Sequence, residues 1–162
     1  MFPPEILRCA ETIVNEARRQ NVHLATAESC TGGLIAACLT EIPGVSDVFE
    51  RGFLVYTNAA KTEMLGVAAE LIERYGAVSQ EVASAMVQGA LERSKATLGV
   101  AVTGIAGPTG GTALKPVGLV HIAAMRAGQA VQCEECRFGD IGRGEVRMKT
   151  VDAALRYLHR LL

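Results

Sequence analysis

The segment from Thr26 to Gly33 holds the residues of this chain that are best suited to chemistry. Its sequence, Thr-Ala-Glu-Ser-Cys-Thr-Gly-Gly, supplies hydroxyl groups, a thiol, a carboxylate and two glycines within eight residues. Apolar residues precede it and small residues follow, which predicts a strand, a sharp turn and a helix. Unpaired N–H groups at a helix N-terminus suit a phosphate or the oxyanion of acyl transfer. The simpler interpretation is that Ser29 or Thr31 caps the helix and the glycines only form the turn.

Two further predicted strands end in residues with useful side chains. The second delivers Tyr56, Thr57, Asn58 and Lys61, and the third delivers Thr103 and a glycine-rich loop over residues 104–112. Ligand sites of α/β sheets lie beyond the carboxyl ends of parallel strands, so we expect these segments to converge. Convergence would bring a serine close to a lysine and a tyrosine. A lysine whose pKa is lowered by burial can, with a tyrosine, take the serine proton.

Helical and strand periodicities alternate along the chain. We expect helices over residues 5–20, 31–40, 68–74, 79–95 and 143–161, and a short helix that Asn58 caps and Gly66 ends. We expect strands over residues 22–27, 49–57, 98–103, 117–125 and 129–138, the last two joined as a hairpin at Ala127-Gly128. This pattern predicts an α/β sandwich with helices on both faces of a mixed sheet, in a single domain over residues 1–162.

Composition narrows the function classes. The chain has 162 residues, a formal net charge of −1 and no basic block, so we expect neither nucleic acid nor anionic membrane as a partner. No apolar run reaches the length of a transmembrane helix, and the N-terminus lacks the regions of a signal peptide, so we expect a cytoplasmic protein. The apolar end of the final helix, Leu161-Leu162, suggests a surface that faces another subunit, in a homo-oligomer (dimer or higher).

Cysteines and histidines give no strong metal or redox motif. The cysteine count is odd, which favours reduced thiols: Cys9, Cys30, Cys38, Cys133 and Cys136. The C-x-x-C formed by the last two falls in a predicted strand and has no second pair at matching spacing, which disfavours zinc or redox use. The three histidines lie away from the hydroxyl-rich turns and are expected to be structural or at the surface: His23, His121 and His159. Arg143 and Arg147 open the last helix either as phosphate ligands or as solvated charges.

Five motifs, in order and over essentially the whole chain, resemble the CinA carboxy-terminal domain family. They are Thr26–Gly33, Phe49–Phe53, Tyr56–Lys61, Gly76–Ser79 and Thr103–Gly111. Stand-alone members of this family are nicotinamide mononucleotide deamidases, also called nicotinamide-nucleotide amidohydrolases. The resemblance implies a three-layer α/β/α domain with a mixed five-stranded sheet. It also implies hydrolysis of the carboxamide of nicotinamide mononucleotide to nicotinate mononucleotide and ammonia, a reaction of NAD metabolism, with neither a metal nor an organic cofactor.

The resemblance also assigns roles to residues. It implies Ser29 as the nucleophile and Lys61 with Tyr56 as the base system that activates it. The implied substrate-binding residues are Glu28, Cys30, Thr31, Gly32, Gly33, Thr103, Gly104, Gly107 and Arg143. Family members usually carry Gly-Asp-Arg directly before the last helix, whereas here Ile141-Gly142 separates Asp140 from Arg143. This insertion weakens the carry-over of the arginine.

Three alternatives remain at this point. Cys30 could replace its neighbour as nucleophile, although a thiol normally pairs with a histidine that is missing here. The glycine turns could hold a mononucleotide without chemistry, in a regulatory module. A nucleotide phosphohydrolase is disfavoured because the sequence shows no metal-type acidic cluster.

Overall fold

A five-stranded mixed sheet runs through the centre of the computed structural model, which describes residues 1–162. The strand order is β2-β1-β3-β4-β5. β1 pairs in parallel with both β2 and β3, whereas β4 is antiparallel to β3 and to β5. The strands are β1 (Leu24–Glu28), β2 (Phe49–Leu54), β3 (Leu98–Gly104), β4 (Leu119–Arg126) and β5 (Gln132–Arg137).

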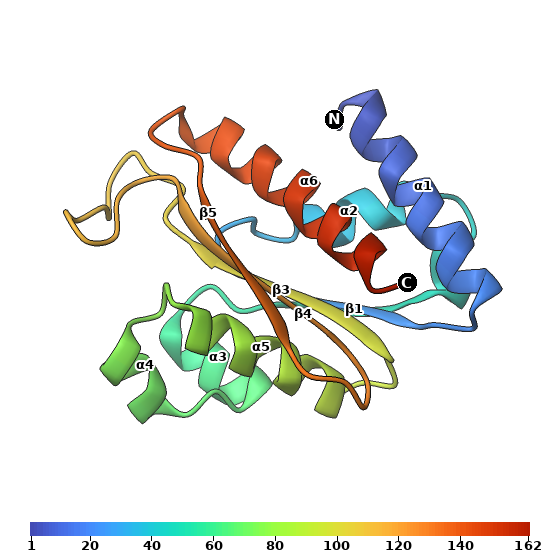
Figure 1. Ribbon diagram of the computed structural model, residues 1–162, viewed down its shortest axis with the longest axis horizontal. Coiled ribbons are helices and arrows are strands. Elements are labelled where there is room, and N and C mark those ends of the chain that lie inside the picture. The colour runs from blue at the N-terminus through green and yellow to red at the C-terminus, as the bar shows by residue number, and fades with distance from the viewer.

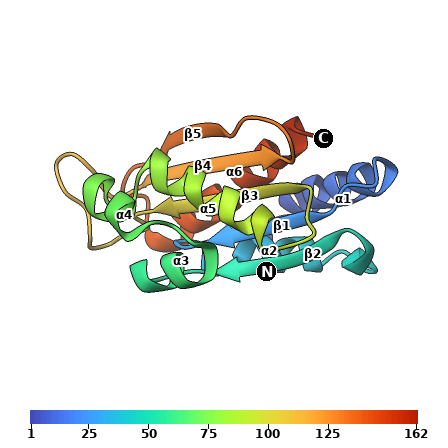
Figure 2. The same cartoon turned by 90° about the horizontal axis from the view of Figure 1, so that it is seen from below.

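Helices cover both faces of this sheet (Figures 1 and 2). One layer contains α1 (Pro4–Arg19), α2 (Leu34–Thr40) and α6 (Arg143–Arg160). The opposite layer contains α3 (Asn58–Leu65), α4 (Ala69–Tyr75) and α5 (Gln80–Glu92). A short 3-10 turn, η1 (Val45–Asp47), precedes β2. The expected three-layer α/β/α architecture is therefore confirmed.

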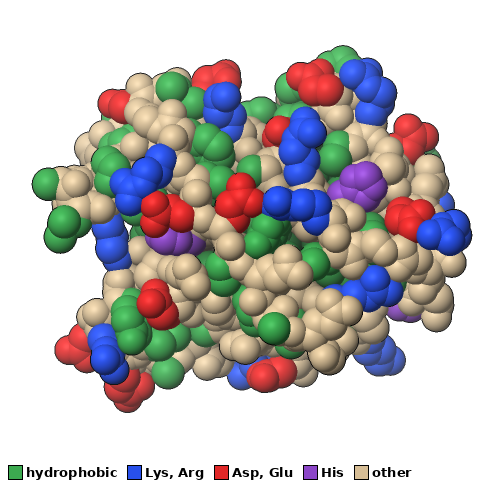
Figure 3. All heavy atoms as spheres, viewed as in Figure 1, with side chains coloured by type: hydrophobic (Ala, Val, Ile, Leu, Met, Phe, Trp, Pro, Cys, Tyr) green, Lys and Arg blue, Asp and Glu red, His purple; other side chains and the backbone are tan.

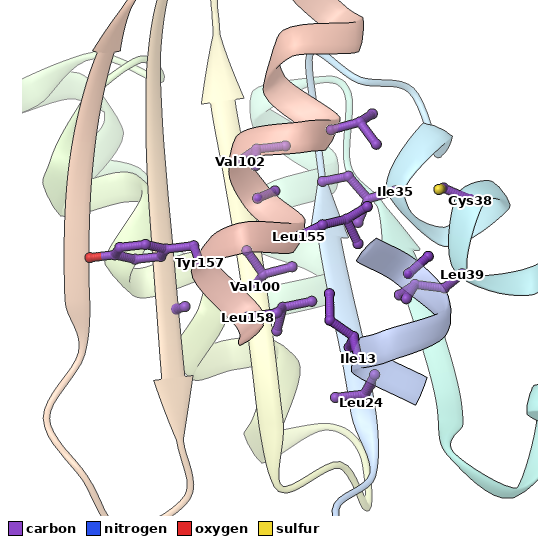
Figure 4. Close-up of a cluster of buried hydrophobic side chains, with 14 of the residues drawn as sticks. Ile13, Leu24, Ile35, Cys38, Leu39, Val100, Val102, Leu155, Tyr157 and Leu158 are labelled. Atoms are coloured by element: carbon purple, nitrogen blue, oxygen red, sulfur yellow. The ribbon is translucent and has the colours of Figure 1, made fainter. Parts of the chain in front are cut away.

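Two hydrophobic clusters hold the layers together. The larger has 28 buried residues and joins the sheet to α1, α2 and α6, with Ile13, Leu155 and Leu158 packed on Val100 and Val102 (Figure 4). The smaller has 13 buried residues and joins the other face of the sheet to α3, α4 and α5. Every residue of β1 is buried, as expected for a central strand that is covered on both faces.

The local signals in the sequence found most element boundaries. Gly66 ends α3 in a left-handed conformation with φ of 69°, and β4 and β5 form the predicted hairpin. The assignment of Asn58 as the cap of α3 is wrong by one residue, because the Thr57 side chain accepts the N–H of Ala60. The second helix begins at Leu34 rather than at residue 31, because residues 29–33 form a tight turn.

Two sequence features have structural explanations. Cys133 packs on the α5 side of the sheet and Cys136 on the α6 side, since residues three apart in a strand face opposite ways. The two thiols therefore cannot bind one metal ion together. Leu161 and Leu162 pack against the larger hydrophobic cluster of this same chain and remain partly exposed. The homo-oligomer itself stays a prediction.

The visible surface over α1 and α6 mixes charges of both signs. Acidic, basic and apolar side chains alternate across the face shown in Figure 3, without a broad patch of one sign. None of the helices has the length and apolar character that crossing a bilayer would require.

Candidate active site

The carboxyl ends of β1, β2 and β3 meet at one edge of the sheet, and a cavity of about 220 Å³ lies there. Eleven residues line it: Ser29, Cys30, Tyr56, Asn58, Lys61, Ala77, Val78, Thr103, Gly104, Ala106 and Arg143. The convergence predicted from the three strand ends is thus present. Three larger hollows, of about 520, 500 and 300 Å³, lie against α6 with β5, between α3 and α4, and between α5 and the end of β4. None of the three is lined by a serine.

Ser29 and Lys61 form the central pair of this cavity. The Lys61 Nζ lies 3.1 Å from the Ser29 Oγ, and both residues are buried, with relative exposures of 1% for the lysine and 8% for the serine. Ser29 follows β1 directly, and its N–H donates to the carbonyl of Val102 on β3. The serine hydroxyl therefore stands on a backbone that two strands hold in place.

Lys61 sits in the first turn of α3, which Thr57 caps. Its Nζ also lies 3.0 Å from the carbonyl oxygen of Val55 and 3.4 Å from that of Tyr56. No carboxylate lies within 4.0 Å of the amine. Burial without a counter-ion disfavours the charged form and lowers the pKa of Lys61 from its ordinary 10.5. The amine is thereby closer to serving as a base near neutral pH.

Tyr56 lies at the exposed rim of the cavity. It is 57% exposed, and its hydroxyl accepts a hydrogen bond of 3.0 Å from the Arg143 Nη2. It contacts Lys61 through its main-chain carbonyl alone. The expected pairing of the Tyr56 phenol with Lys61 is therefore not seen, because the side chain turns outward toward α6.

Arg143 is the first residue of α6 and reaches the same rim. Besides the tyrosine, it donates through Nη1 to the carbonyl of Gly107 at 3.0 Å. Ile141 and Gly142 lengthen the preceding loop, yet the guanidinium still lines the cavity. Gly107 itself does not line the cavity and takes part through this carbonyl.

Glu28 was expected to bind substrate, but its carboxylate is buried away from the cavity. It is 1% exposed and accepts hydrogen bonds from the Thr31 hydroxyl and from the N–H groups of Ile35 and Ala36. These donors belong to the turn and the first turn of α2, which has no side-chain cap of its own. The carboxylate thus satisfies the unpaired N–H groups of this helix and does not reach the cavity.

Thr31, Gly32 and Gly33 also lie outside the lining of the cavity and shape the turn. Gly32 and Gly33 have φ of 61° and 93°, a region that glycine adopts without strain. The Gly32 N–H donates to the Ser29 carbonyl, and the carbonyl of Thr31 accepts from the Arg147 Nη2 at 2.8 Å. Arg147 therefore braces the turn and does not line the cavity.

The turn still leaves three backbone donors free, those of Cys30, Thr31 and Gly33. The N–H groups of Cys30 and Thr31 donate to no oxygen acceptor of the protein. They directly follow the Ser29 hydroxyl in sequence, and a pair of such donors can stabilise the negative oxygen of a tetrahedral intermediate. The Gly32 N–H is used within the turn.

The Cys30 thiol faces the same cavity but is poorly suited to be a nucleophile. Burial raises its pKa from 9.0 to about 12, and the negative charge of Glu28 adds to this effect. The nearby Lys61 and the N–H groups of Cys30 and Thr31 act in the opposite direction without reversing the shift. Because the thiolate is the reactive form of cysteine, this thiol is inert at neutral pH.

Two other parts of the site lie where they were predicted. Thr103 and Gly104 end β3 and line the cavity, and the Thr103 hydroxyl donates to the carbonyl of Ala77 at 2.8 Å. Asn58 and Ala106 belong to the segments that were expected to converge, although neither was named as a site residue. Two lining residues were not predicted at all: Ala77 and Val78. Each of them lies inside one of the recognised motifs, but its side chain carries no chemistry that would single it out. No group of three or more His, Cys, Asp or Glu side chains is arranged to hold a metal ion.

Comparison with known proteins places this geometry in a family. The family model for the CinA C-terminal domain matches residues 7–162. Among solved structures, the competence/damage inducible protein CihA from Agrobacterium tumefaciens is 52% identical, with a TM-score of 0.98 over 99% of this chain and 98% of that one. A CinA superfamily protein from Escherichia coli is 33% identical, with a TM-score of 0.92 over 100% of this chain and 94% of that one.

Longer relatives match as well. A CinA-like protein from Akkermansia muciniphila is 56% identical over 74% of this chain, and one from Chlorobium phaeobacteroides is 49% identical over 89%. The matched regions are 29% and 35% of those proteins, so the chain spans about a third of their length. With the family model, the shared fold and these identities in agreement, the chain belongs to the CinA C-terminal domain family.

Proposed function

We propose that this protein is a serine amidase that hydrolyses the carboxamide of nicotinamide mononucleotide to nicotinate mononucleotide and ammonia. The observation that carries the proposal is the buried pair of Ser29 and Lys61, 3.1 Å apart at the floor of a cavity. A serine with a lysine as its base is an established variant of the nucleophile–base arrangement. Membership of the CinA family supports the same chemistry.

The first half of the reaction forms an acyl-enzyme. Neutral Lys61 takes the proton of the Ser29 hydroxyl as Oγ bonds to the amide carbon, and the amide oxygen becomes an oxyanion. The N–H groups of Cys30 and Thr31 stabilise this oxygen, and one such donor has been worth about 3–4 kcal/mol in other enzymes. When the carbon–nitrogen bond breaks, Lys61 returns its proton to the nitrogen, which leaves as ammonia.

Hydrolysis completes the cycle with the same groups. A water molecule attacks the acyl carbon and gives its proton to Lys61. The bond from that carbon to Oγ breaks, Oγ recovers the proton from Lys61, and the resulting carboxylic acid gives its remaining proton to solvent and leaves as the carboxylate. We assign the base role to Lys61 alone, because the phenol of Tyr56 bonds to Arg143 and not to the lysine.

The size of the cavity indicates that only part of the substrate enters it, while the rest lies at the rim. Its 220 Å³ lies below the roughly 300–1,000 Å³ of typical small-molecule pockets, so it suits the amide-bearing ring and not a whole mononucleotide. The phosphate would then lie at the open rim, where Arg143 stands. Arginine binds phosphate through two parallel N–H donors, which fits this place.

One assay tests the proposal against its rivals. The purified protein is incubated with nicotinamide mononucleotide and a chelator, and ammonia and phosphate are measured separately. Release of ammonia alone is the expected result. Phosphate release would instead identify a phosphohydrolase, and binding without either product would identify a non-catalytic nucleotide-binding module.

A further inference from the structure

One wall of the cavity is a short segment that begins at the end of α4 and runs toward α5. This segment, residues 75–78, comprises Tyr75, the last residue of α4, and three residues without regular secondary structure, of which Ala77 and Val78 line the cavity. No backbone N–H bonds to any of the four carbonyl oxygens in this segment. Such a segment has to be held by side chains if it is to keep one position.

Three side chains bind all four carbonyls. The hydroxyl of Ser79, the residue that caps α5, donates to the carbonyl of Gly76 at 2.9 Å. The Thr103 hydroxyl donates to Ala77. The other two carbonyls are bound by Lys115 alone, whose Nζ donates to Tyr75 at 2.6 Å and to Val78 at 2.8 Å.

Lys115 reaches this wall from the glycine-rich loop between β3 and β4. The loop spans residues 105–118 and projects at the same end of the molecule as α4 in both views (Figures 1 and 2). Its Ala106 lines the cavity beside Gly104 at the end of β3, and its Gly107 carbonyl accepts from Arg143. Lys115 therefore ties the loop that carries one wall of the cavity to the segment that carries another.

The surroundings of the Lys115 amine are suited to holding the segment in place. The amine is half-buried and lies within 4.0 Å of no carboxylate, so its charge is matched by the two carbonyls. Hydrogen bonds from a charged donor are roughly twice as strong as neutral ones. A Cβ added to Gly76 would lie 2.7 Å from the Lys115 Nζ, and Gly76 has φ of 78°, so glycine both shapes the segment and leaves room for the amine.

We propose that Lys115 is a positioning residue for the reaction at Ser29. By fixing residues 75–78 against the loop, it sets the distance between two walls of the cavity and hence where the substrate amide rests relative to the nucleophile. Lys115 does not line the cavity, and it acts through Ala77 and Val78. This inference rests on the proposed function, because it concerns the placing of that substrate.

The test compares Lys115→Met with Lys95→Met, a control at an exposed lysine outside the cavity. We expect Lys115→Met to lower kcat/KM at least about 10-fold, with a raised KM, since small misplacements of a substrate cost that much or more. The pH at half-maximal kcat/KM should not move, because Lys61 is untouched. Amide hydrogen exchange should quicken at Gly76, within the segment, and at Val82, just beyond it, because both amides are hydrogen-bonded.

A purely structural role would lower the melting temperature and the active fraction while leaving KM unchanged, which would overturn the proposal. Wild-type KM and kcat together with unchanged exchange would overturn it as well. If Lys115→Met does not fold, Lys115→Arg replaces it, and its retained charge should give a smaller rise in KM. Should the wild-type protein release no ammonia, the proposed function fails, while the exchange comparison still decides whether Lys115 holds the wall.

Discussion

The amine of Lys61 approaches the hydroxyl of Ser29 along one direction while two backbone carbonyls occupy the others. Its Nζ lies 3.0 Å from the oxygen of Val55, 3.4 Å from that of Tyr56 and 3.1 Å from the serine Oγ. A neutral amine has two N–H donors and one lone pair. If both donors serve the carbonyls, the lone pair faces the serine proton. The backbone of residues 55 and 56 thus orients the base without adding a negative charge that would raise its pKa.

The nucleophile assignment predicts the largest single loss of activity. We expect Ser29→Ala to lower kcat by at least about 10³-fold, since removing the nucleophile of a serine hydrolase leaves only binding and oxyanion contributions. Folding and substrate binding should persist, because Oγ bonds only to Lys61. Steady-state kinetics and a binding titration measure the two effects. Ser84→Ala on α5 is the matched control and should retain wild-type turnover.

A separate substitution tests whether Cys30 is the nucleophile. We expect Cys30→Ser to lower turnover less than about tenfold, because burial keeps this thiol protonated and unreactive near neutral pH. Turnover is measured beside the wild-type protein at one pH. A loss as large as that of Ser29→Ala would transfer the nucleophile to the cysteine.

The state of Lys61 predicts the pH dependence of the reaction. The base works only as a neutral amine, and burial lowers its pKa below 10.5. We therefore expect kcat/KM to rise with pH and to reach half of its maximum at a pH below 10.5. The Cys30 thiol should not add a step to this rise below about pH 11, because its own pKa is about 12.

Lys61→Arg tests whether Lys61 acts as a base or only as a positive charge. A guanidinium does not lose its proton in this pH range, so the variant should be inactive throughout. Initial rates between pH 6 and 10 make the measurement. Activity in Lys61→Arg, or a profile that falls as pH rises over this range, would contradict the assignment.

The sequence predicted the convergence of three strand ends because that convergence follows from the topology of parallel strands. Periodicity and turn residues place Ser29 directly after a strand, Thr103 at the end of one and Lys61 in the helix that follows one, and parallel pairing brings such positions together. The resemblance could not predict the direction of the Tyr56 side chain or the groups that the Glu28 carboxylate binds. Those directions depend on partners remote in sequence, such as Arg143, or on which unpaired helix donors need an acceptor.

Glu28 is predicted to contribute to stability and not to substrate contact. Glu28→Ala would leave the Thr31 hydroxyl and two N–H groups of α2 without their acceptor. Each unsatisfied buried donor costs about 1–3 kcal/mol, so we expect a loss of about 3 kcal/mol or more in the free energy of unfolding. Urea denaturation measures this loss. Glu63→Ala, at an exposed site on α3, should change the free energy by less than about 0.5 kcal/mol.

Arg143 is predicted to contact the phosphate of the substrate. In Arg143→Gln the charged fork is lost, and hydrogen bonds to charged groups are worth about 1.5–3 kcal/mol. We therefore expect KM for nicotinamide mononucleotide to rise about 10- to 100-fold with a smaller change in kcat. The measurement is a pair of steady-state titrations, one with the mononucleotide and one with nicotinamide riboside, which lacks the phosphate.

The riboside decides between two roles of this arginine, because Arg143 also bonds to Gly107 and to Tyr56. If it binds phosphate, Arg143→Gln should impair the mononucleotide far more than the riboside, and Arg143→Lys should recover part of the difference through its charge. If Arg143 only braces the rim, activity should fall to the same extent with both substrates. Tyr56→Phe removes the acceptor of one bracing bond while keeping the guanidinium, so under the phosphate assignment it should change the ratio between the two substrates little.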